Sequence, residues 1–366
     1  MADFDASTSC GGQHVPMPNQ TLSCLINAAA DRAAVPAPAD DAGAFHAALP
    51  GYAPTPLREL PALAAELGVA AVSLKDESHR LGLPAFKVLG ASWAVERALR
   101  EDPRVTTLVA ASAGNHGRAV AHIAAQRGLA CRIFLPARAA VARRDAIAAE
   151  GAEIVVVDGD YEDAVARAGL AGMELGAVEI ADVGGSSPAR WVIDGYATLF
   201  TEAAAQGDHD MIVVPVGVGS LAAAAARHAA QRGARVIGAE PVSAACLTAS
   251  LAAGEPTRVP TPGTTMAGLD CAEISSAAWP SLRVGIHGTV AVGDARVAAA
   301  VRELATAGFA IGESGAAPLA ALRALAADPA CLGLRAAVRL DRYSRVLLIA
   351  TEGPTDPETY RRALAM

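Results

Sequence analysis

Residues 211–240 read MIVVPVGVGSLAAAAARHAAQRGARVIGAE, and this stretch determines the fold class. The apolar, β-branched run 211–216 predicts a strand, and the alanine-rich run 220–232 predicts a helix. A second apolar run, 235–240, predicts another strand. Two strands joined by a helix pair in parallel, and continuous apolar runs are typical of strands buried on both faces. The stretch therefore predicts a parallel sheet covered by helices.

The same alternation of strand and helix continues along the chain. Further strands are predicted at 69–74, 106–112, 131–136, 153–158 and 345–351. Further helices are predicted at 88–100, 117–128, 137–150 and 314–327. Because strands and helices alternate over 366 residues, we expect an α/β protein with two three-layer α/β/α domains and mainly parallel sheets.

Composition and charge narrow the class of protein. The net charge of −8 argues against a general affinity for nucleic acid or anionic membranes. The amino-terminal sequence has no basic region before an apolar run, and no apolar run reaches the roughly 18 residues of a transmembrane helix. We therefore expect a cytoplasmic protein. Residues 1–50 are rich in Ala, Pro, Asp and Gly and predict a loosely ordered arm or lid, whereas residues 254–263 predict a loop.

Six cysteines are scattered through the chain, at Cys10, Cys24, Cys131, Cys246, Cys271 and Cys331. They form no Cys-x-x-Cys pair and no cluster with histidine, so the sequence predicts no metal site. Disulfides are rare in the cytoplasm, and we therefore expect reduced, partly buried thiols.

The turns between strands and helices are the candidate binding positions, because ligands of open α/β sheets bind beyond the carboxyl ends of the strands. In SAGNHG (112–117), small residues allow a ligand to approach, and Asn115 offers a hydrogen-bond donor and an acceptor. GVGS (217–220) stands at a helix N-terminus, where backbone N–H groups bind anions such as phosphate. This turn also matches GxGxxA, with Glu240 about 20 residues further on, as in dinucleotide-binding enzymes. From the turn alone, both interpretations remain open.

Lys87 favours one of these interpretations. It lies between two apolar residues, and in such surroundings the pKa of a lysine can be lowered so that its amine is a nucleophile. The last predicted strand runs into ATEGPTD (350–356), which brings Thr351 and Glu352 to the same edge of a sheet. A lysine, a phosphate-binding turn and an asparagine turn together are typical of a pyridoxal-phosphate site. A dinucleotide enzyme leaves Lys87 unexplained.

Six blocks of the sequence resemble the diaminopropionate ammonia-lyases. They are SLKDESHRLGLPAFKVLGASWAV (73–95), ASAGNHGRAVA (111–121), PVGVGSLAA (215–223), GTTMAGLDCAE (263–273), GESGA (312–316) and LLIATEGPTDPETY (347–360). That family belongs to the tryptophan-synthase-like (fold type II) pyridoxal-phosphate enzymes. The resemblance implies the same fold, with a large cofactor-binding domain of residues 1–88 and 190–366, a smaller mobile domain of residues 89–189, and a homodimer.

The resemblance also implies which residues hold the cofactor. Lys87 would bind pyridoxal phosphate covalently, and Asn115 would hydrogen-bond its 3-hydroxyl. Thr351 would be the neutral partner of the pyridine nitrogen. The phosphate would be held by the amides of Gly217, Val218 and Gly219, together with Ser220.

On the substrate side, the resemblance implies that Asp182 is catalytic alongside Lys87, as a partner for the amino group that leaves. The other substrate-binding residues implied are Ser112, Ala113, Gly114, His116 and Met266. Cys246 and Cys271 match positions that are paired in some relatives, whereas the expected cytoplasmic location favours free thiols.

Ala113 departs from the family pattern, which typically reads DGNHG at this turn and uses its aspartate as a second acid/base on D-configured substrate. A methyl group cannot take a proton. We therefore expect Lys87 to be the sole base and the substrate to be the L enantiomer.

The resemblance implies a reaction on a small amino acid, in which 2,3-diaminopropionate loses ammonia and yields pyruvate and a second ammonia. The SAGNHG turn also suits a serine or threonine dehydratase, or a β-replacing enzyme with the same cofactor. From another class, GVGSLA (217–222) and Glu240 favour an NAD-dependent dehydrogenase. A further alternative is a module that binds pyridoxal phosphate without catalysis.

Overall fold

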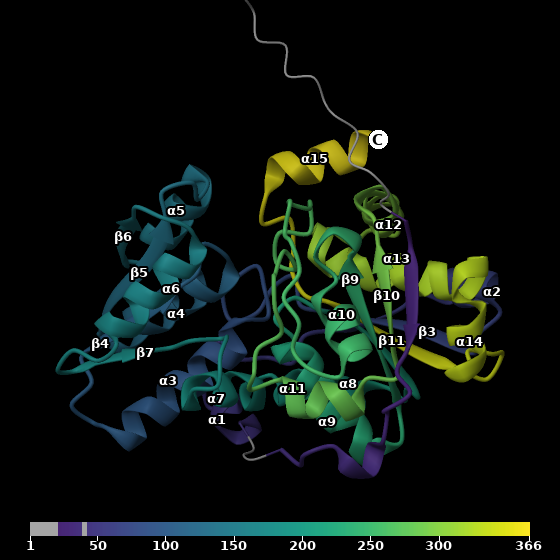
Figure 1. The fold of residues 1–366 in the computed structure, drawn as a ribbon, viewed down its shortest axis with the longest axis horizontal. Coiled ribbons are helices and arrows are strands. Elements are labelled where there is room, and N and C mark those ends of the chain that lie inside the picture. The colour runs from purple at the N-terminus through teal and green to yellow at the C-terminus, as the bar shows by residue number, and fades with distance from the viewer. Residues whose placement is uncertain (1–20, 39–41) are drawn as a thin grey trace, which may run out of the picture.

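The computed structural model describes residues 21–38 and 42–366 of the chain (Figure 1). Its strands are β1 (Ser23–Ile26), β2 (Leu57–Glu59), β3 (Ala71–Asp76), β4 (Thr107–Ala111), β5 (Ala130–Pro136), β6 (Glu153–Val157), β7 (Ala177–Glu179), β8 (Met211–Pro215), β9 (Arg235–Pro241), β10 (Gly288–Val292) and β11 (Arg345–Ala350). Its α-helices are α1 (Gly43–Ala47), α2 (Pro61–Leu67), α3 (Val88–Glu101), α4 (Asn115–Arg127), α5 (Val141–Ala148), α6 (Tyr161–Ala171), α7 (Ser187–Gly195), α8 (Ala197–Gln206), α9 (Ser220–Arg232), α10 (Cys246–Ala253), α11 (Trp279–Gly285), α12 (Asp294–Thr306), α13 (Glu313–Ala327), α14 (Leu332–Ala337) and α15 (Pro357–Ala365). Short 3-10 helices are η1 (Arg32–Ala34), η2 (Val242–Ala244) and η3 (Pro329–Cys331).

The strands form two sheets, which lie side by side in Figure 1. The large sheet has the order β1-β10-β9-β8-β11-β3-β2, and only its two edge strands, β1 and β2, pair antiparallel. The small sheet has the order β6-β5-β4-β7 and is parallel throughout. The mainly parallel α/β architecture predicted from 211–240 is confirmed, and residues 254–263 form a loop as predicted. The edge strands β1, β2 and β7 and the inner strand β10 were not predicted.

Helices cover both faces of the large sheet. Alternate residues of a strand point to opposite faces. In β11, Val346 and Leu348 pack in the core cluster that contains α12 and α13, whereas Leu347 and Ile349 pack in the cluster that contains α8 and α9. Both faces of this strand are therefore dry, which explains its continuous apolar run.

The small sheet is covered in the same way. Val109 and Phe134 pack with the alanines of α6 on one face. Leu108 and Ile133 of the same two strands pack with α4 on the other. The predicted three-layer arrangement is thus present in both sheets.

Helices α3 and α7 pack closely between the two sheets, and two glycines allow it (Figure 1). A Cβ atom on Gly195 would lie 2.7 Å from the carbonyl oxygen of Leu89, and one on Gly90 would lie 2.6 Å from a ring carbon of Tyr196. Larger residues would therefore force these helices apart. The predicted domains, 1–88 with 190–366 and 89–189, and the mobility of the smaller one, stay predictions.

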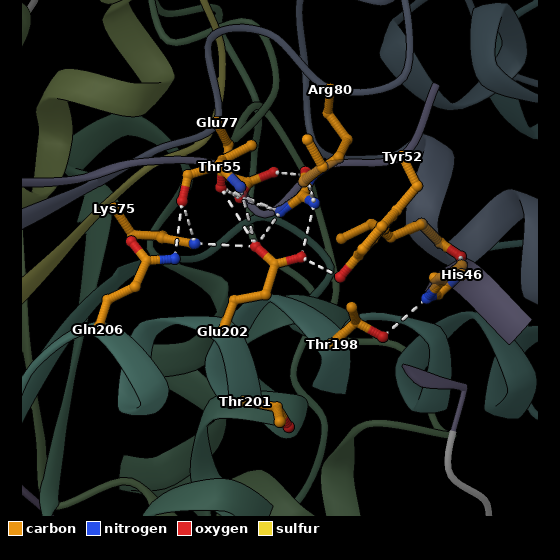
Figure 2. Close-up of polar contacts among 12 residues, drawn as sticks. His46, Tyr52, Thr55, Lys75, Glu77, Arg80, Thr198, Thr201, Glu202 and Gln206 are labelled. Atoms are coloured by element: carbon orange, nitrogen blue, oxygen red, sulfur yellow. Dashed lines mark hydrogen bonds and ion pairs between the residues drawn. The ribbon is translucent and has the colours of Figure 1, made fainter. Parts of the chain in front are cut away.

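Four charged side chains form a buried ion cluster, three from the segment that leads to Lys87 and one from α8, namely Lys75, Glu77, Arg80 and Glu202 (Figure 2). Arg80 donates to both carboxylates, at 2.6 Å to Glu77 Oε1 and 2.7 Å to Glu202 Oε1. Lys75 Nζ lies 2.8 Å from Glu202 Oε2. Burial raises the pKa of Glu202, but Arg80 and Lys75 more than offset it and hold that pKa at about 2. Two cations thus balance two anions inside the protein.

The buried ion cluster also anchors the amino-terminal segment. Tyr52 donates its hydroxyl to Glu202 Oε1 at 2.7 Å, and the backbone N–H of Thr55 donates to Oε2 at 3.1 Å (Figure 2). Nearby, His46 is fully buried, with Nδ1 2.7 Å from Thr198 Oγ1. The described part of residues 1–50 therefore differs from a loose arm, because it supplies a sheet edge, Ser23–Ile26, and a buried histidine.

Cys24 of β1 and Cys331 of η3 form a disulfide, with their Cα atoms 5.4 Å apart. The expectation of reduced thiols throughout is wrong for this pair, whose separation of 307 residues hides it from any local pattern. Cys131, Cys246 and Cys271 are free thiols, so the pairing of Cys246 with Cys271 implied by the resemblance is not formed. Cys10 lies outside the described residues.

Across residues 21–38 and 42–366, no single helix is long and apolar enough to cross a membrane. One pair bent by 85°, Glu313–Ala327 with Pro329–Ala337, reaches that length and composition only when taken together. Within the same ranges, no group of three or more His, Cys, Asp or Glu side chains is arranged to hold a metal ion.

Candidate active site

The predicted site residues follow the carboxyl ends of parallel strands. SAGNHG (112–117) follows β4, GVGS (217–220) follows β8, and Thr351 follows β11. Lys87 immediately precedes α3. Because carboxyl ends of parallel strands share one edge of a sheet, this topology gathers residues that are far apart in the chain.

Lys87 is one of only two lysines in the sequence, the other being Lys75. Lys75 is fully buried and donates to Glu202 and to the backbone carbonyl of Thr55. The side chain of Lys87 is 22% exposed, so part of it borders solvent. Lys87 is therefore the side-chain amine available for covalent chemistry.

Lys87 is paired with a carboxylate. Its Nζ donates a hydrogen bond of 2.7 Å to Asp182 Oδ2. Burial lowers the pKa of Lys87, but the Asp182 carboxylate outweighs burial and the net pKa is raised. The lowered pKa predicted from its apolar neighbours is therefore wrong, because local sequence does not reveal a carboxylate 95 residues further on. In this state Lys87 is a cation, and it becomes a base only after Nζ gives up its proton.

Asp182 also faces His116. His116 Nδ1 lies 3.8 Å from Asp182 Oδ2, and Nε2 lies 2.7 Å from the carbonyl oxygen of Ile180, to which it donates. Burial lowers the pKa of His116, which favours the neutral ring. Burial raises the pKa of Asp182, yet the positive charges of His116, which is protonated at low pH, and of Lys87 bring it down to about 2. Asp182 is therefore ionised at neutral pH.

The SAGNHG turn is tight and places Asn115 at the start of α4. A Cβ atom on Gly117 would lie 2.2 Å from the carbonyl oxygen of Ser112, so the turn requires glycine there. Asn115 Nδ2 donates to Glu352 Oε2 at 2.5 Å. Ser112 and Ala113 are half-buried and Gly114 is exposed, so this turn borders solvent.

The GVGS turn forms a cradle at the N-terminus of α9. A Cβ atom on Gly217 would meet the carbonyl oxygen of Gly268 at 2.8 Å, and Gly219 has a φ of +92° that favours glycine. Within residues 21–38 and 42–366, no backbone hydrogen bond uses the N–H groups of Gly217, Gly219 or Ser220. Open amides at a helix N-terminus suit a phosphate group. Val218 stands between the two glycines of this turn, and Ser220 Oγ donates to the backbone carbonyl of Asp182 at 3.0 Å.

Thr351 is buried and joins the segment that carries Lys87. Its carbonyl oxygen accepts from the N–H of Phe86 at 3.2 Å. A Cβ atom on Gly315, in GESGA, would approach the N–H of Thr351 to 3.1 Å. The residue after β11 therefore contacts both the first turn of α13 and Phe86, the residue before Lys87.

Sequence reasoning missed Tyr196 and the placement of Cys271. The Tyr196 hydroxyl is buried without a hydrogen-bond partner among the described residues, and burial raises its pKa, so the phenol is neutral. Cys271 Sγ would lie 3.0 Å from a Cβ atom on Gly217. Burial raises the pKa of Cys271 to about 12, so this thiol is neutral. No local motif separates these two residues from ordinary core residues.

Met266 is a core residue in the structure. Its side chain is fully buried and packs in the core cluster of the large sheet that contains α13. Its predicted contact with substrate stays a prediction.

Glu240 caps a helix rather than facing an open site. Its carboxylate is fully buried and accepts from the N–H groups of Leu247 and Thr248 at 2.7 and 2.9 Å, at the start of α10. A ribose-binding acid of a dinucleotide enzyme must reach its ligand. The burial of Glu240 removes one of the two observations on which the dehydrogenase alternative depended.

Replacing Glu240 with glutamine is expected to alter the pH dependence of stability. Burial raises the pKa of Glu240 from 4.5 to about 7. A carboxyl whose pKa is higher in the folded state stabilises that state below the unfolded pKa and loses this contribution as pH rises through the folded pKa. The free energy of unfolding of the wild type relative to Glu240→Gln should therefore fall by about 3 kcal/mol between about pH 4 and pH 8. Urea unfolding of both proteins across this range measures it, and a constant difference would contradict the assignment.

Comparison with known proteins decides the family. The model of the family described as pyridoxal-phosphate dependent enzyme matches residues 48–348. The chain belongs to the pyridoxal-phosphate-dependent enzymes. Within this family it is similar to the diaminopropionate ammonia-lyase of Salmonella typhimurium, with 33% identity over 87% of this chain and 89% of that protein. It is also similar to the biosynthetic L-threonine dehydratase of the same organism, with 30% identity over 74% of this chain and 52% of that protein.

Solved structures of this pyridoxal-phosphate family confirm the fold. The diaminopropionate ammonia-lyase of Escherichia coli, in complex with an aminoacrylate-PLP azomethine reaction intermediate, superposes with a TM-score of 0.85 at 30% identity, covering 94% of this chain and 97% of that one. The same enzyme in complex with D-serine superposes with a TM-score of 0.85 at 29% identity and the same coverage. The predicted tryptophan-synthase-like fold is therefore correct.

The residues present fit pyridoxal phosphate, which is the cofactor of this enzyme. The glycine cradle leaves amides open at a helix N-terminus, and the carbonyl of Asp182, whose carboxylate binds Lys87, accepts from Ser220 of that cradle. Asp182 therefore contacts the glycine cradle through its backbone carbonyl and Lys87 through its carboxylate, which places the anion site near the lysine amine. The protein is a pyridoxal-phosphate-dependent β-elimination enzyme of the ammonia-lyase type.

Proposed function

We propose that the protein removes ammonia from L-2,3-diaminopropionate, leaving pyruvate and a second ammonia as final products. The observation that supports this proposal most directly is the 2.7 Å pair between Lys87 Nζ and the buried carboxylate of Asp182. It joins an amine that can remove an α-proton to a carboxylate that can hold a second cationic group. Elimination of an amino substituent needs both.

In this proposal the cofactor is held by residues from three turns. Lys87 Nζ attaches it, the amides of Gly217, Val218 and Gly219 with Ser220 bind its phosphate, and Asn115 and Thr351 contact its ring. Bound pyridoxal phosphate supplies an electron sink for the charge that develops when the α-proton leaves. Because Thr351 is neutral, it would stabilise less charge on the ring than an acidic partner would. This favours loss of a β-substituent over racemisation or transamination.

Lys87 and Asp182 divide the proton transfers. In its neutral form, Lys87 Nζ would take the α-proton and become an ammonium, which the Asp182 carboxylate would stabilise. Asp182 is ionised, with a pKa of about 2 beside the Lys87 ammonium, and is not the proton donor in this proposal. It binds the β-ammonium of the substrate instead. An amine leaves as neutral ammonia only from its ammonium form, with the electron pair of the Cβ–N bond, so this carboxylate promotes departure.

The L configuration follows from what stands opposite Lys87 in the proposal. Ala113 offers a methyl group where related enzymes carry a carboxylate, and nothing in SAGNHG except neutral His116 can accept a proton. One base then removes a proton from one face of the substrate. Ser112, Gly114 and the N–H groups at the start of α4, which make no backbone hydrogen bond within the described residues, would bind the substrate carboxylate.

Replacing Ala113 with aspartate is expected to add activity on D-2,3-diaminopropionate while retaining most activity on the L enantiomer. A second base of this kind contributes about 100-fold or more to a proton transfer. Pyruvate release from each enantiomer measures the change, and Ala113→Asn, which has a similar volume but no basic group, is the control. Equal D activity in the aspartate and asparagine variants would contradict the assignment.

The proposed substrate is tested by adding L-2,3-diaminopropionate to the wild-type holoenzyme and measuring pyruvate and ammonia. Two ammonia molecules per pyruvate support the proposal. L-Serine and L-threonine are tested in parallel, because the similarity to threonine dehydratase favours a dehydratase as the second candidate. Turnover of serine or threonine, with none of diaminopropionate, would replace the first candidate by the second.

The homodimer and the cytoplasmic location stay predictions. Analytical ultracentrifugation of the full chain tests the first. A mass of about 74 kDa is expected for two copies of this 36.9 kDa chain.

A further inference from the structure

Glu352 is a buried carboxylate without a cationic partner. It is 6% exposed and directly follows Thr351. No lysine or arginine in residues 21–38 and 42–366 forms an ion pair with it. Its hydrogen bonds come from neutral groups, Asn115 Nδ2 at 2.5 Å and Thr355 Oγ1 at 3.5 Å. A buried carboxylate is costly unless it is hydrogen-bonded, so the short bond to Asn115 is its principal support.

The backbone holds Glu352 in place from both sides. Its carbonyl oxygen accepts from the N–H of Gly312 at 3.0 Å, and Glu352 forms an antiparallel bridge with Ala85. The next residue, Gly353, donates its N–H to the carbonyl of Pro84 at 3.0 Å. Residues 84–86 lead directly to Lys87. The short stretch 351–353 therefore carries the Glu352 side chain and also bonds to the segment that leads to Lys87.

Asn115 reaches Glu352 from the other sheet. It is the first residue of α4, which covers the small sheet, whereas Glu352 follows β11 of the large sheet (Figure 1). The bond therefore links the two sheets across 237 residues of sequence. It also fixes the amide, because Nδ2 must point to the carboxylate, which leaves its second N–H and Oδ1 for another partner.

We propose that Glu352 is a positioning residue for the cofactor, acting through Asn115. Its carboxylate sets the orientation of the Asn115 amide toward bound pyridoxal phosphate and holds the start of α4 against the segment that carries Lys87. The inference depends on the contact between Asn115 and the cofactor stated under the proposed function. It does not depend on which amino acid is the substrate.

A double-mutant cycle on cofactor affinity tests the inference without using turnover. Glu352→Leu, Asn115→Ala and the double variant are prepared as apoproteins, and the dissociation constant of pyridoxal phosphate is measured by equilibrium dialysis. A hydrogen bond to a charged group corresponds to a change of about tenfold to a hundredfold in an equilibrium constant. We expect each single variant to weaken binding by about tenfold or more, and the double variant to bind no more weakly than the weaker single variant.

Two conservative variants separate positioning from a general loss of structure. Glu352→Gln keeps an acceptor within reach of Asn115 and should bind the cofactor within about threefold of the wild type. Glu352→Asp keeps the charge but is one methylene shorter, and it should resemble Glu352→Leu; it decides the matter if the leucine variant does not fold, which circular dichroism reports. Glu303→Gln, whose partner Arg323 lies on α13 outside the site, is the control and should leave affinity unchanged.

The possible results have distinct meanings. Unchanged affinity in Asn115→Ala would remove the proposed contact between Asn115 and the cofactor. Weak binding in Asn115→Ala with normal binding in Glu352→Leu would overturn the positioning role of Glu352 alone. Multiplying effects in the double variant, or failure of glutamine to rescue, would show that Glu352 acts independently of Asn115.

Discussion

Lys87→Ala is expected to lose turnover by about ten-thousandfold or more, because the variant loses both the covalent attachment point and the base that removes the α-proton. The chain offers no substitute. Its only other lysine, Lys75, is fully buried in the ion cluster with Glu202. Pyruvate release from L-2,3-diaminopropionate measures the loss. The absorbance band at roughly 410–420 nm, which is typical of a lysine-linked pyridoxal, should disappear with it.

Lys87→Arg is the matched control for this variant. Alanine leaves the buried carboxylate of Asp182 without its cation, which by itself destabilises the protein. Arginine keeps a positive charge beside Asp182 but cannot attach the cofactor. We expect Lys87→Arg to unfold at a temperature close to that of the wild type and still to be inactive. Borohydride reduction of the wild-type holoenzyme, followed by peptide mass analysis, should place the cofactor on Lys87. Label on Lys75, or activity in either variant, would contradict the assignment.

Glu202→Leu is expected to lower the free energy of unfolding by about 3–5 kcal/mol, the usual cost of removing one partner from a buried ion pair. Glu202 accepts from Arg80, Lys75 and Tyr52 (Figure 2), and without it two buried cations face only Glu77. Urea unfolding measures the change. Glu66→Gln, which breaks an exposed pair with Arg323, is the control and should produce no measurable change.

The pH dependence of this difference gives a second readout. The pKa of Glu202 is lowered from 4.5 to about 2 in the folded protein. A carboxyl with a lowered pKa stabilises the folded state above its unfolded pKa, and the contribution disappears as pH falls through the folded pKa. The stability difference between the wild type and Glu202→Leu should therefore shrink as pH falls from about 4.5 toward 2. A difference that is constant over this range would mean that Glu202 stabilises by packing rather than by charge.

Much of the fold and part of the site could be predicted from local patterns. The run 211–240 encodes strand, glycine turn, helix and strand, and the structure has β8, α9 and β9 at those positions. Helix α9 begins and ends at the predicted residues because glycines stand at both caps, Gly219 and Gly233, each with positive φ. Three of the missed strands, β1, β2 and β7, are short edge strands whose pairing depends on a distant partner, whereas the fourth, β10, lies inside the large sheet.

The site shows the same division. Lys87, the SAGNHG turn and the GVGS turn could be recognised because each is a local arrangement whose chemistry is visible in a few adjacent residues. The sign of the Lys87 pKa could not, because it depends on Asp182, and the role of Glu240 could not, because it depends on amides at the start of α10. At Lys87 the surroundings reversed the predicted direction of the pKa shift. At Glu240 they showed that the carboxylate caps a helix instead of binding a ligand.

By itself, the sequence determined that this protein is an α/β enzyme of the pyridoxal-phosphate type with Lys87 as its candidate lysine. Only the tertiary structure decided which charges meet. The pairs Lys87–Asp182, Asn115–Glu352 and Cys24–Cys331 join residues 95, 237 and 307 positions apart. The physical reason is that backbone propensity and apolar periodicity act over a few residues, whereas electrostatic and covalent partners are set by the order of strands in a sheet. That order follows from the packing of the whole chain, and it places the carboxylate that makes Lys87 a cation.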